Sequence, residues 1–186
     1  MRLFFSVRGQ DFNKYAGTAK AAYASGKLED SRFAMQQMLQ ELDMISGKET
    51  LKILPTQMGI LSAVAGKDNV SGASGFAGVI IHREYGSGEK TASIEIISNS
   101  PIIASVNAIL AIPFIGSAGN GDQKVIKIQG YKALVQKQVG DDKKVSYDVQ
   151  VPLSSTLLTL KTENLDEDIV KLANTLPVSQ IAKTLQ

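Results

Sequence analysis

The sequence predicts an α+β protein in which an N-terminal helical hairpin precedes an antiparallel sheet of about six strands, with helices packed on one face. Three observations support this fold class. Apolar residues recur at intervals of three and four up to about residue 47, as in amphipathic helices. From about residue 75 the pattern changes to extended runs, and the short turns between them make neighbouring strands antiparallel. The chain returns to a helical pattern at its C-terminus.

Composition and charge exclude several classes of protein. Of the 186 residues, 44% are hydrophobic and 20% are charged, which argues against disorder. The net charge is +2 and the lysines are spread along the chain, unlike the concentrated basic face of a nucleic-acid-binding protein. The absence of cysteine excludes disulfides and thiol nucleophiles. The first apolar run is too short for a signal peptide, so Met1 is either native or a start codon added to a mature chain.

Two amphipathic helices are predicted between about Gln10 and Gly47. The first carries an apolar stripe from Phe12 to Tyr23, and Gly26 supplies the left-handed residue that ends many helices. Gly47 is expected to end the second helix, whose stripe comprises Met35, Met38, Leu39, Leu42 and Ile45. The hairpin either packs on the sheet or presents its methionine-rich stripe to a second copy. A monomer and a homodimer are both compatible with it.

Residues 66–75 (GKDNVSGASG) are predicted to be a linker, because they are small, polar and rich in turn formers. This stretch suggests a division into a helical hairpin with its connector, residues 1–65, and an antiparallel α+β domain, residues 66–186. The alternative is one compact unit without a boundary.

Six extended runs are predicted beyond the linker. They span residues 75–85, 91–100, 124–129, 131–139, 145–152 and 155–162. Ile94 and Ile96 alternate with other residues, as expected for a sheet with one covered face. A helix follows the last run, and Asn164 and Glu167 have the spacing of a capping box at its start.

The most apolar segment lies between the second and third predicted strands. Ser100 and Pro101 form a helix start, and no residue from Ile102 to Ile115 is charged. A helix that is apolar on every side must be covered on every side. The segment is shorter than the about 20 residues of a membrane span, so no transmembrane segment is expected. We therefore expect a buried core helix or the wall of an apolar pocket over residues 101–115.

As a pocket wall, this helix would hold a small hydrophobic ligand. Ligand sites are mainly apolar, with a few polar groups that orient the ligand. The residues that would line such a site are Ile103, Asn107, Ile109 and Phe114. Asn107 would supply the orienting hydrogen bond.

His82 is the only histidine in the chain and lies in the predicted strand IHREY. The period of a strand places His82 and Glu84 on one face, and Arg83 and Tyr85 on the other. His82 with Glu84 could act as a general base, and Ser74 would complete a hydrolase. No G-x-S-x-G motif holds that serine, so we interpret the residues from 82 to 85 as a polar cluster and assign no catalytic residue.

Other features carry no cofactor or metal assignment. The glycine-rich residues 116–121 follow a helix and precede a strand, which is the reverse of a nucleotide-binding loop. The acidic clusters at 141–142 and 166–168 lack the spacing of a calcium loop. Lysines between 124 and 137 could form a basic stripe, but Tyr131 is the only aromatic residue among them, and single-strand binders need stacking platforms. We expect no cofactor, no metal and no nucleic acid.

Short motifs resemble those of an uncharacterised group of bacterial proteins that are predicted to be exported. The motifs are GFAG (75–78), HREY (82–85), SNSPII (98–103) and GYKALV (130–135), within roughly residues 28–175. The order of elements is also similar to the PsbP/DcrB-like α+β fold. That resemblance implies an antiparallel sheet flanked by helices and a non-enzymatic binding or accessory role. It also implies a periplasmic or secreted location, with the cytoplasm as the alternative, and it supplies no catalytic residue.

These observations favour a non-catalytic accessory or binding domain of the bacterial cell envelope, with an unknown protein partner. The first alternative is a carrier of a small hydrophobic ligand in an apolar pocket. The second is a small hydrolase that uses His82.

Overall fold

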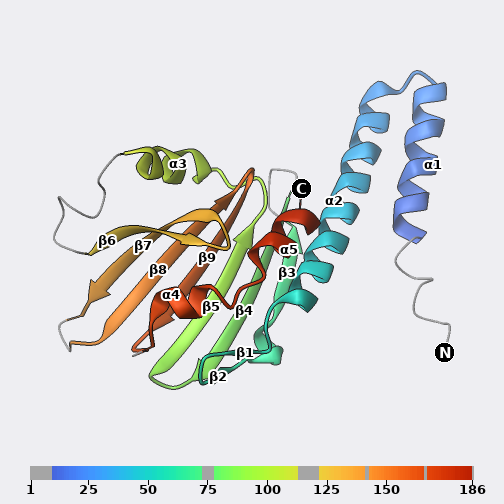
Figure 1. Cartoon of the computed structure of the whole chain (residues 1–186). Helices are drawn as coiled ribbons and strands as arrows, with labels where there is room; N and C mark the ends of the chain where they lie inside the picture. The colour runs from blue at the N-terminus through green and yellow to red at the C-terminus, as the bar shows by residue number, and fades with distance from the viewer. Residues whose placement is uncertain (1–9, 73–77, 113–121, 141–142, 166, 186) are drawn as a thin grey trace.

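The computed structural model describes residues 10–72, 78–112, 122–140, 143–165 and 167–185. A helical hairpin projects from one edge of an antiparallel sheet, and shorter helices lie against the sheet (Figure 1). The α+β class, the N-terminal pair of helices and the antiparallel sheet confirm the fold predicted from the sequence.

The main sheet has seven strands in the described part of the chain, in the order β3-β4-β5-β9-β8-β7-β6, and all its neighbours are antiparallel. The bounds are β3 (Asn69–Gly72), β4 (Val79–Ser87), β5 (Lys90–Ile97), β6 (Gln123–Ile128), β7 (Tyr131–Val139), β8 (Val145–Leu153) and β9 (Thr156–Glu163). Only β5 and β9 are neighbours without being consecutive. Their pairing joins the two halves into one sheet.

The strand missed by the sequence analysis is β3, which lies in the stretch predicted to be a linker. A 3-10 turn, η1 (Ala65–Lys67), precedes it, and Val70 pairs with Ile81 at the sheet edge. Val70 is half-buried and packs against the core. The glycine and serine content that indicated a linker also suits a short edge strand, since edge strands are often kept short. Residues 73–77 of the expected linker lie outside the described residues.

One face of the sheet carries the main hydrophobic core. Alternate residues of the strands point to this face, and Ile81, Ile94 and Leu160 are fully buried there. The elements that cover it are the end of the second helix, β1 (Gln57–Met58), β2 (Leu61–Ser62), α4 (Ile169–Ala173) and α5 (Val178–Thr184) (Figure 1).

Helix α4 begins later than the capping-box spacing predicted. Asp168 is its N-cap residue, and a carboxylate oxygen of Asp168 accepts a hydrogen bond from the Val170 amide at 2.9 Å. Glu167 instead accepts a hydrogen bond from the Ile60 amide at 3.0 Å. The capping-box prediction at Asn164 was wrong, because the carboxylate of Asp168 accepts the hydrogen bonds of the first free amides of α4.

Helix α2 (Leu28–Ile53) continues through Gly47, which was expected to end it. A Cβ atom on Gly47 would lie 2.6 Å from Cγ2 of Val79 and 2.8 Å from Cγ1 of Val70. The glycine therefore lets the helix backbone approach β3 and β4 closely, although glycine inside a helix costs about 1 kcal/mol relative to alanine. This contact holds the C-terminal half of α2 on the sheet.

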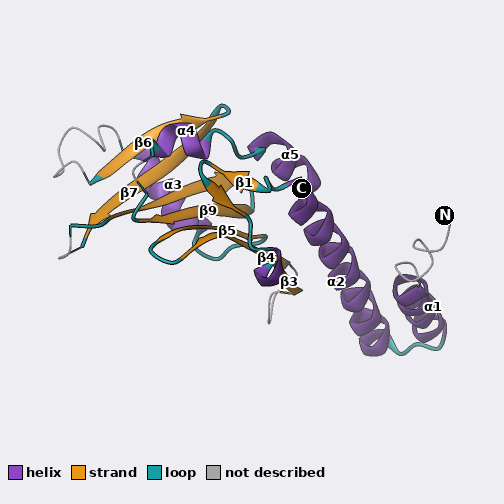
Figure 2. Cartoon of the chain, turned by 90° about the horizontal axis from the view of Figure 1, so that it is seen from below, coloured by secondary structure: helices purple, strands orange, loops and turns teal. Residues whose placement is uncertain are grey.

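Helix α1 (Gln10–Ala24) packs antiparallel on the N-terminal half of α2, as predicted. Small side chains at Ala19, Ala22 and Ala34 are buried between the helices, and the Ser31 hydroxyl donates to the Ala19 carbonyl at 2.9 Å. Gly26 has φ +75° in the connecting turn, as its position in the sequence indicated. The tip of the hairpin lies away from the sheet (Figures 1 and 2).

Helix α3 (Ile103–Ala111) lies on the opposite face of the sheet from the main core. Val106 and Leu110 are buried against Leu134 and Leu157, whose neighbours along β7 and β9 point into the main core. The outer side is open to solvent, and at the two ends Ile102 is 49% and Ile112 is 55% exposed. The prediction of a helix buried on every side was wrong, because a helix that rests on a sheet without another layer of described residues over it buries only its inner side.

Candidate functional site

Strand β4 sorts the predicted polar cluster onto two faces, as its period of two indicated. His82 and Glu84 lie on the open face, with His82 Nε2 3.4 Å from Glu84 Oε1. Lys67 donates a hydrogen bond to the other carboxylate oxygen of Glu84. The hydrogen bond from Lys67, with a smaller contribution from His82, lowers the pKa of Glu84 below its ordinary value.

Arg83 and Tyr85 face the core and tie β4 to the end of α2. Arg83 donates from Nε and Nη2 to the two carboxylate oxygens of Asp68 at 2.9 and 2.6 Å, and from Nη1 to the Leu54 carbonyl at 2.9 Å. The Tyr85 hydroxyl donates to the Pro55 carbonyl at 2.8 Å, and burial raises the pKa of Tyr85 to about 12. These two residues stabilise the fold and do not line the open face.

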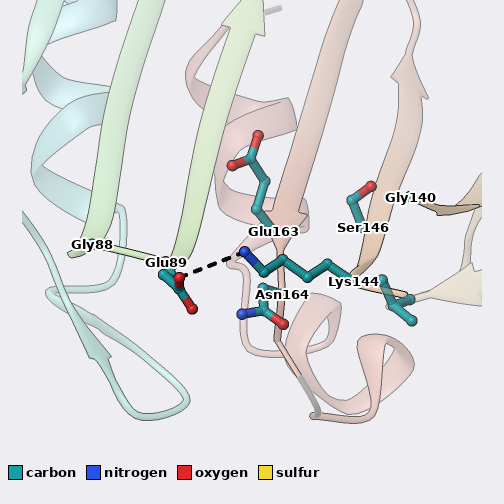
Figure 3. A pocket seen from close by; sticks show the side chains of 8 residues that line it. Gly88, Glu89, Gly140, Lys144, Ser146, Glu163 and Asn164 are labelled. Atoms are coloured by element: carbon teal, nitrogen blue, oxygen red, sulfur yellow. Dashed lines mark ion pairs between the residues drawn. The ribbon is translucent and has the colours of Figure 1, made fainter. Parts of the chain in front are cut away.

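The open face holds three adjoining cavities at the end of the sheet away from α3. Their volumes are about 350, 180 and 250 Å³. The largest lies between the β4–β5 turn and the start of β8, as Figure 3 shows. Glu163 lines all three cavities, and Lys161 lines two of them. We call this combined surface the open-face groove, and its titratable members are His82, Glu84, Glu89, Lys144, Asp148, Lys161 and Glu163.

The open-face groove carries an excess of negative charge. Its four carboxylates outnumber its two lysines, which leaves a net charge of 2 − 4 = −2 with His82 neutral. The Lys144 side chain reaches across the largest cavity toward Glu89, with Nζ 3.6 Å from Oε1 (Figure 3). Glu163 forms no ion pair with any of the described residues. The groove therefore attracts a positively charged group.

Asp148 is a half-buried carboxylate of the open-face groove whose two oxygens differ in their partners: its carboxylate receives a side-chain hydrogen bond from Gln150, and its Oδ1 has none from the described residues. It lies opposite Lys161 in the β8–β9 register and is half-buried. Desolvation raises the pKa of its carboxyl, although the charge of Lys161 acts in the opposite direction. Its Oδ1 atom is enclosed and accepts no hydrogen bond from any described residue. Asp148 lines the 180 Å³ cavity, and a carboxylate oxygen is an acceptor only, so the Asp148 carboxylate is suited to a donor on a ligand bound there.

The residues predicted to line an apolar pocket lie at different depths along α3 and beyond it. Asn107 is exposed, and Ile103 and Ile109 are half-buried. Phe114 lies outside the described residues. Val106 and Leu110, which the prediction did not single out, pack directly on the sheet. The expectation that Ile109 is fully buried was wrong, because it lies at the margin of the contact.

The sequence analysis found His82 and Glu84 but missed Asp148, Lys161 and Glu163. The signal for them is the placement of polar residues at every second position, at 146, 148 and 150 in one run and at 159, 161 and 163 in the next. That alternation places Asp148 beside Lys161 once β8 and β9 pair. Their proximity to His82 depends on the pairing of β9 with β5, which joins segments distant in the sequence. No local pattern shows that pairing.

Comparisons of the chain with protein-family models, with curated proteins and with solved structures find no match. None of the helices described above is both long and apolar enough to cross a membrane. Across the described ranges, no three histidine, aspartate or glutamate side chains are arranged to hold a metal ion.

Proposed function

We propose that this chain is a non-catalytic binding domain whose open-face groove takes a ligand bearing a positively charged amine or guanidinium group. The observation that carries the proposal is Asp148, a half-buried carboxylate that lines the 180 Å³ cavity together with Glu163. Burial disfavours the charged form of Asp148 and raises the pKa of its carboxyl. A cationic donor bound in that cavity would stabilise the charged carboxylate.

The shape of the open-face groove supports this proposal. The walls of the two smaller cavities come from β4, β5, β7, β8 and β9 of one sheet, so this part of the site needs little ordering when a ligand binds, and turns at the ends of these strands complete the largest cavity. Cavities of about 350 and 250 Å³ suit a small polar molecule or the side chains of an extended peptide. Glu163, which is shared by all three cavities, would contact a ligand in any of them.

The proposed setting is an accessory role in the bacterial cell envelope. Its support is the resemblance of the HREY and GYKALV motifs to those of exported bacterial proteins. The proposed ligand class does not depend on this setting.

A hydrolase that uses His82 is the second candidate. It is supported by the 3.4 Å contact between His82 and Glu84, and by Ser93, which lines the same cavity. In that role Glu84 would orient the imidazole and a hydroxyl would be the nucleophile. The binding proposal is favoured because Glu84 is already bonded to Lys67, and no hydrogen bond joins His82 to a serine within the described residues. Ester hydrolysis that is lost in His82→Ala would favour the hydrolase.

Isothermal titration calorimetry with spermidine, arginine amide and N-acetylglutamate tests the binding proposal. We expect the two cations to bind and the anion to fail. Loss of a charge-assisted hydrogen bond costs about 1.5–3 kcal/mol, so Asp148→Asn lowers the affinity about 10- to 100-fold. The matched control is Glu29→Gln, which removes a carboxylate from the distant hairpin. The absence of cation binding, or equal affinity in Asp148→Asn, contradicts the proposal.

A further inference from the structure

The α1–α2 hairpin exposes more large apolar side chains than the rest of the described chain. Ten large hydrophobic residues are exposed in the described ranges, and six of them lie in the hairpin. Those six are Tyr23, Leu28, Phe33, Met35, Leu39 and Leu42, with exposed fractions between 45% and 70%. Such a concentration of exposed apolar side chains marks an interaction surface.

Four of these residues form one stripe along α2. Leu28, Met35, Leu39 and Leu42 are separated by seven, four and three residues, which is the spacing of a coiled-coil seam. Arg32 and Ser46 occupy the two remaining seam positions between residues 28 and 46. This seam of 19 residues is about 27 Å long, at a rise of 1.5 Å per residue.

Tyr23 extends the stripe onto α1. Ala21 and Ser25 line a groove with Phe33 on one side of the hairpin. In a helix, Tyr23 lies about 200° from both of these neighbours, so its side chain points to the other side of the hairpin. The apolar face formed by Tyr23 and the four residues of the α2 seam therefore spans both helices at the tip of the hairpin and lies on α2 along the rest of its length. We call it the hairpin face.

We propose that the hairpin face docks a second copy of this chain, with the two α2 helices antiparallel, to form a four-helix bundle. The hairpin of a second copy supplies an α2 seam of the same length, with its α1 beside it, to cover this face. A two-fold axis makes such a contact self-complementary.

The single charge within the seam favours the antiparallel orientation. Parallel seams would place Arg32 against the same arginine of the second copy, and like charges brought together are destabilising. Antiparallel seams that pair Met35 with the partner's Leu39 place Arg32 beside the partner's Leu42 and Asp43. The stem of the arginine then packs on leucine, and its guanidinium reaches a carboxylate.

The size of the hairpin face indicates a contact that dissociates on dilution. The α2 seam is about 27 Å long and about one helix wide, roughly 10 Å, and Tyr23 widens it onto α1 at the tip of the hairpin. Stable interfaces bury about 800 Å² of accessible surface on each partner, which is more than this seam supplies. The hairpin projects away from the sheet, so the sheet does not cover this end of it (Figures 1 and 2).

Analytical ultracentrifugation of the full chain tests the contact. We expect a dimer that dissociates on dilution, and a monomer for Leu39→Glu at the same concentration. Lys48→Glu is the matched control, since it introduces the same residue at an exposed position on the opposite side of α2 and should leave the dimer intact. Circular dichroism checks that Leu39→Glu is folded, as expected for a substitution at an exposed site.

Cross-linking tests the orientation, because the chain has no cysteine of its own. In the antiparallel bundle, two copies of Met35→Cys lie close to the two-fold axis, and a short bismaleimide joins them. Two copies of Leu28→Cys lie about 27 Å apart along the bundle and are not joined. A mixture of Leu28→Cys with Ser46→Cys is joined again.

The proposal fails if the wild-type chain stays monomeric up to about 1 mM, a concentration at which even weak association is detected. It also fails if Leu39→Glu remains dimeric, or if Leu28→Cys cross-links with itself while Met35→Cys does not. Binding of a monomeric chain to phosphatidylglycerol vesicles would assign the hairpin face to a membrane surface instead and would overturn the proposal.

Discussion

Arg83 and Asp68 form a two-point ion pair in which Nε and Nη2 of the arginine meet the two carboxylate oxygens at 2.9 and 2.6 Å. The arginine is 9% exposed and also donates to the Leu54 carbonyl. The pair therefore joins β4, the start of β3 and the end of α2 at the corner where the hairpin meets the sheet. Its hydrogen bonds satisfy a guanidinium that would otherwise be buried without partners.

Removal of one partner should be far more costly than removal of an exposed ion pair. Asp68→Ala leaves Arg83 buried without its carboxylate and should lower the free energy of unfolding by about 3 kcal/mol. Lys52→Ala breaks the exposed pair between Lys52 and Glu49, and should change it by less than about 1 kcal/mol. Urea unfolding measures both variants. Similar losses in the two would show that the Arg83–Asp68 pair is not a buried anchor.

Two helical glycines should respond to alanine with opposite signs. Gly47→Ala places a methyl group against Val79 and Val70, and we expect a loss of about 1–3 kcal/mol in the free energy of unfolding. Gly17→Ala meets nothing within 4 Å in α1, so it should gain up to about 1 kcal/mol. Thermal unfolding compares the two. A stabilising Gly47→Ala would contradict the close approach of α2 to the sheet.

Tyr85 should make the fold sensitive to alkaline pH. Its pKa is about 12, whereas the ordinary value is 10.0, so the folded state disfavours the phenolate. The resulting contribution to stability is complete below pH 10 and is lost as the pH rises from 10 to 12. Tyr85→Phe removes the hydrogen bond to the Pro55 carbonyl and should lower the free energy of unfolding by about 1 kcal/mol at neutral pH. Between pH 10 and 12 the free energy of unfolding of this variant should fall less than that of the wild type. Unfolding curves at three pH values check this, and parallel declines in both proteins would count against it.

Ionisation of Asp148 should destabilise the fold. Its pKa is raised by burial, so the contribution of Asp148 to stability is fully present below the ordinary value of 3.8 and is lost as the pH rises through the raised pKa. Asp148→Asn removes the buried charge and should be more stable than the wild type at neutral pH. The difference should disappear in acid. A less stable Asp148→Asn at neutral pH would indicate that the carboxylate is well satisfied.

Substitutions on the inner and outer sides of α3 should differ sharply in their effect on the free energy of unfolding. Leu110 is buried against Leu134 and Leu157, and Leu110→Ala should cost about 2–3 kcal/mol. Asn107 is exposed on the same helix, so Asn107→Ala should change the free energy of unfolding by less than about 0.5 kcal/mol. Urea unfolding tests the pair. Equal losses would mean that α3 is enclosed on all sides, as its sequence first suggested.

The local patterns of the sequence predicted most of the fold. Period-two alternation predicted β4 to β9 within a few residues, and it placed His82 and Glu84 opposite Arg83 and Tyr85 correctly. Those predictions succeeded because a residue's face in a strand depends only on its neighbours along the chain.

The predictions that were wrong concern residues whose structure depends on contacts with segments distant in the sequence. Gly47 reads locally as a helix end, yet its contact with Val79 and Val70 explains it. The segment from Ile102 to Ile112 is apolar on all sides, but nothing in its own sequence shows that only one side meets the sheet. The open-face groove depends on the same kind of information, because the pairing of β5 with β9 brings its residues together.

The most direct test of the cation-binding groove is a nitrogen-15 NMR titration of the wild-type chain with arginine amide, repeated on Asp148→Asn. The binding proposal predicts that the amides whose signals shift lie on β4, β5, β8 and β9 around Asp148, and that the shifts are greatly reduced in the variant. Shifts that lie elsewhere on the chain, or that persist unchanged in Asp148→Asn, would contradict it.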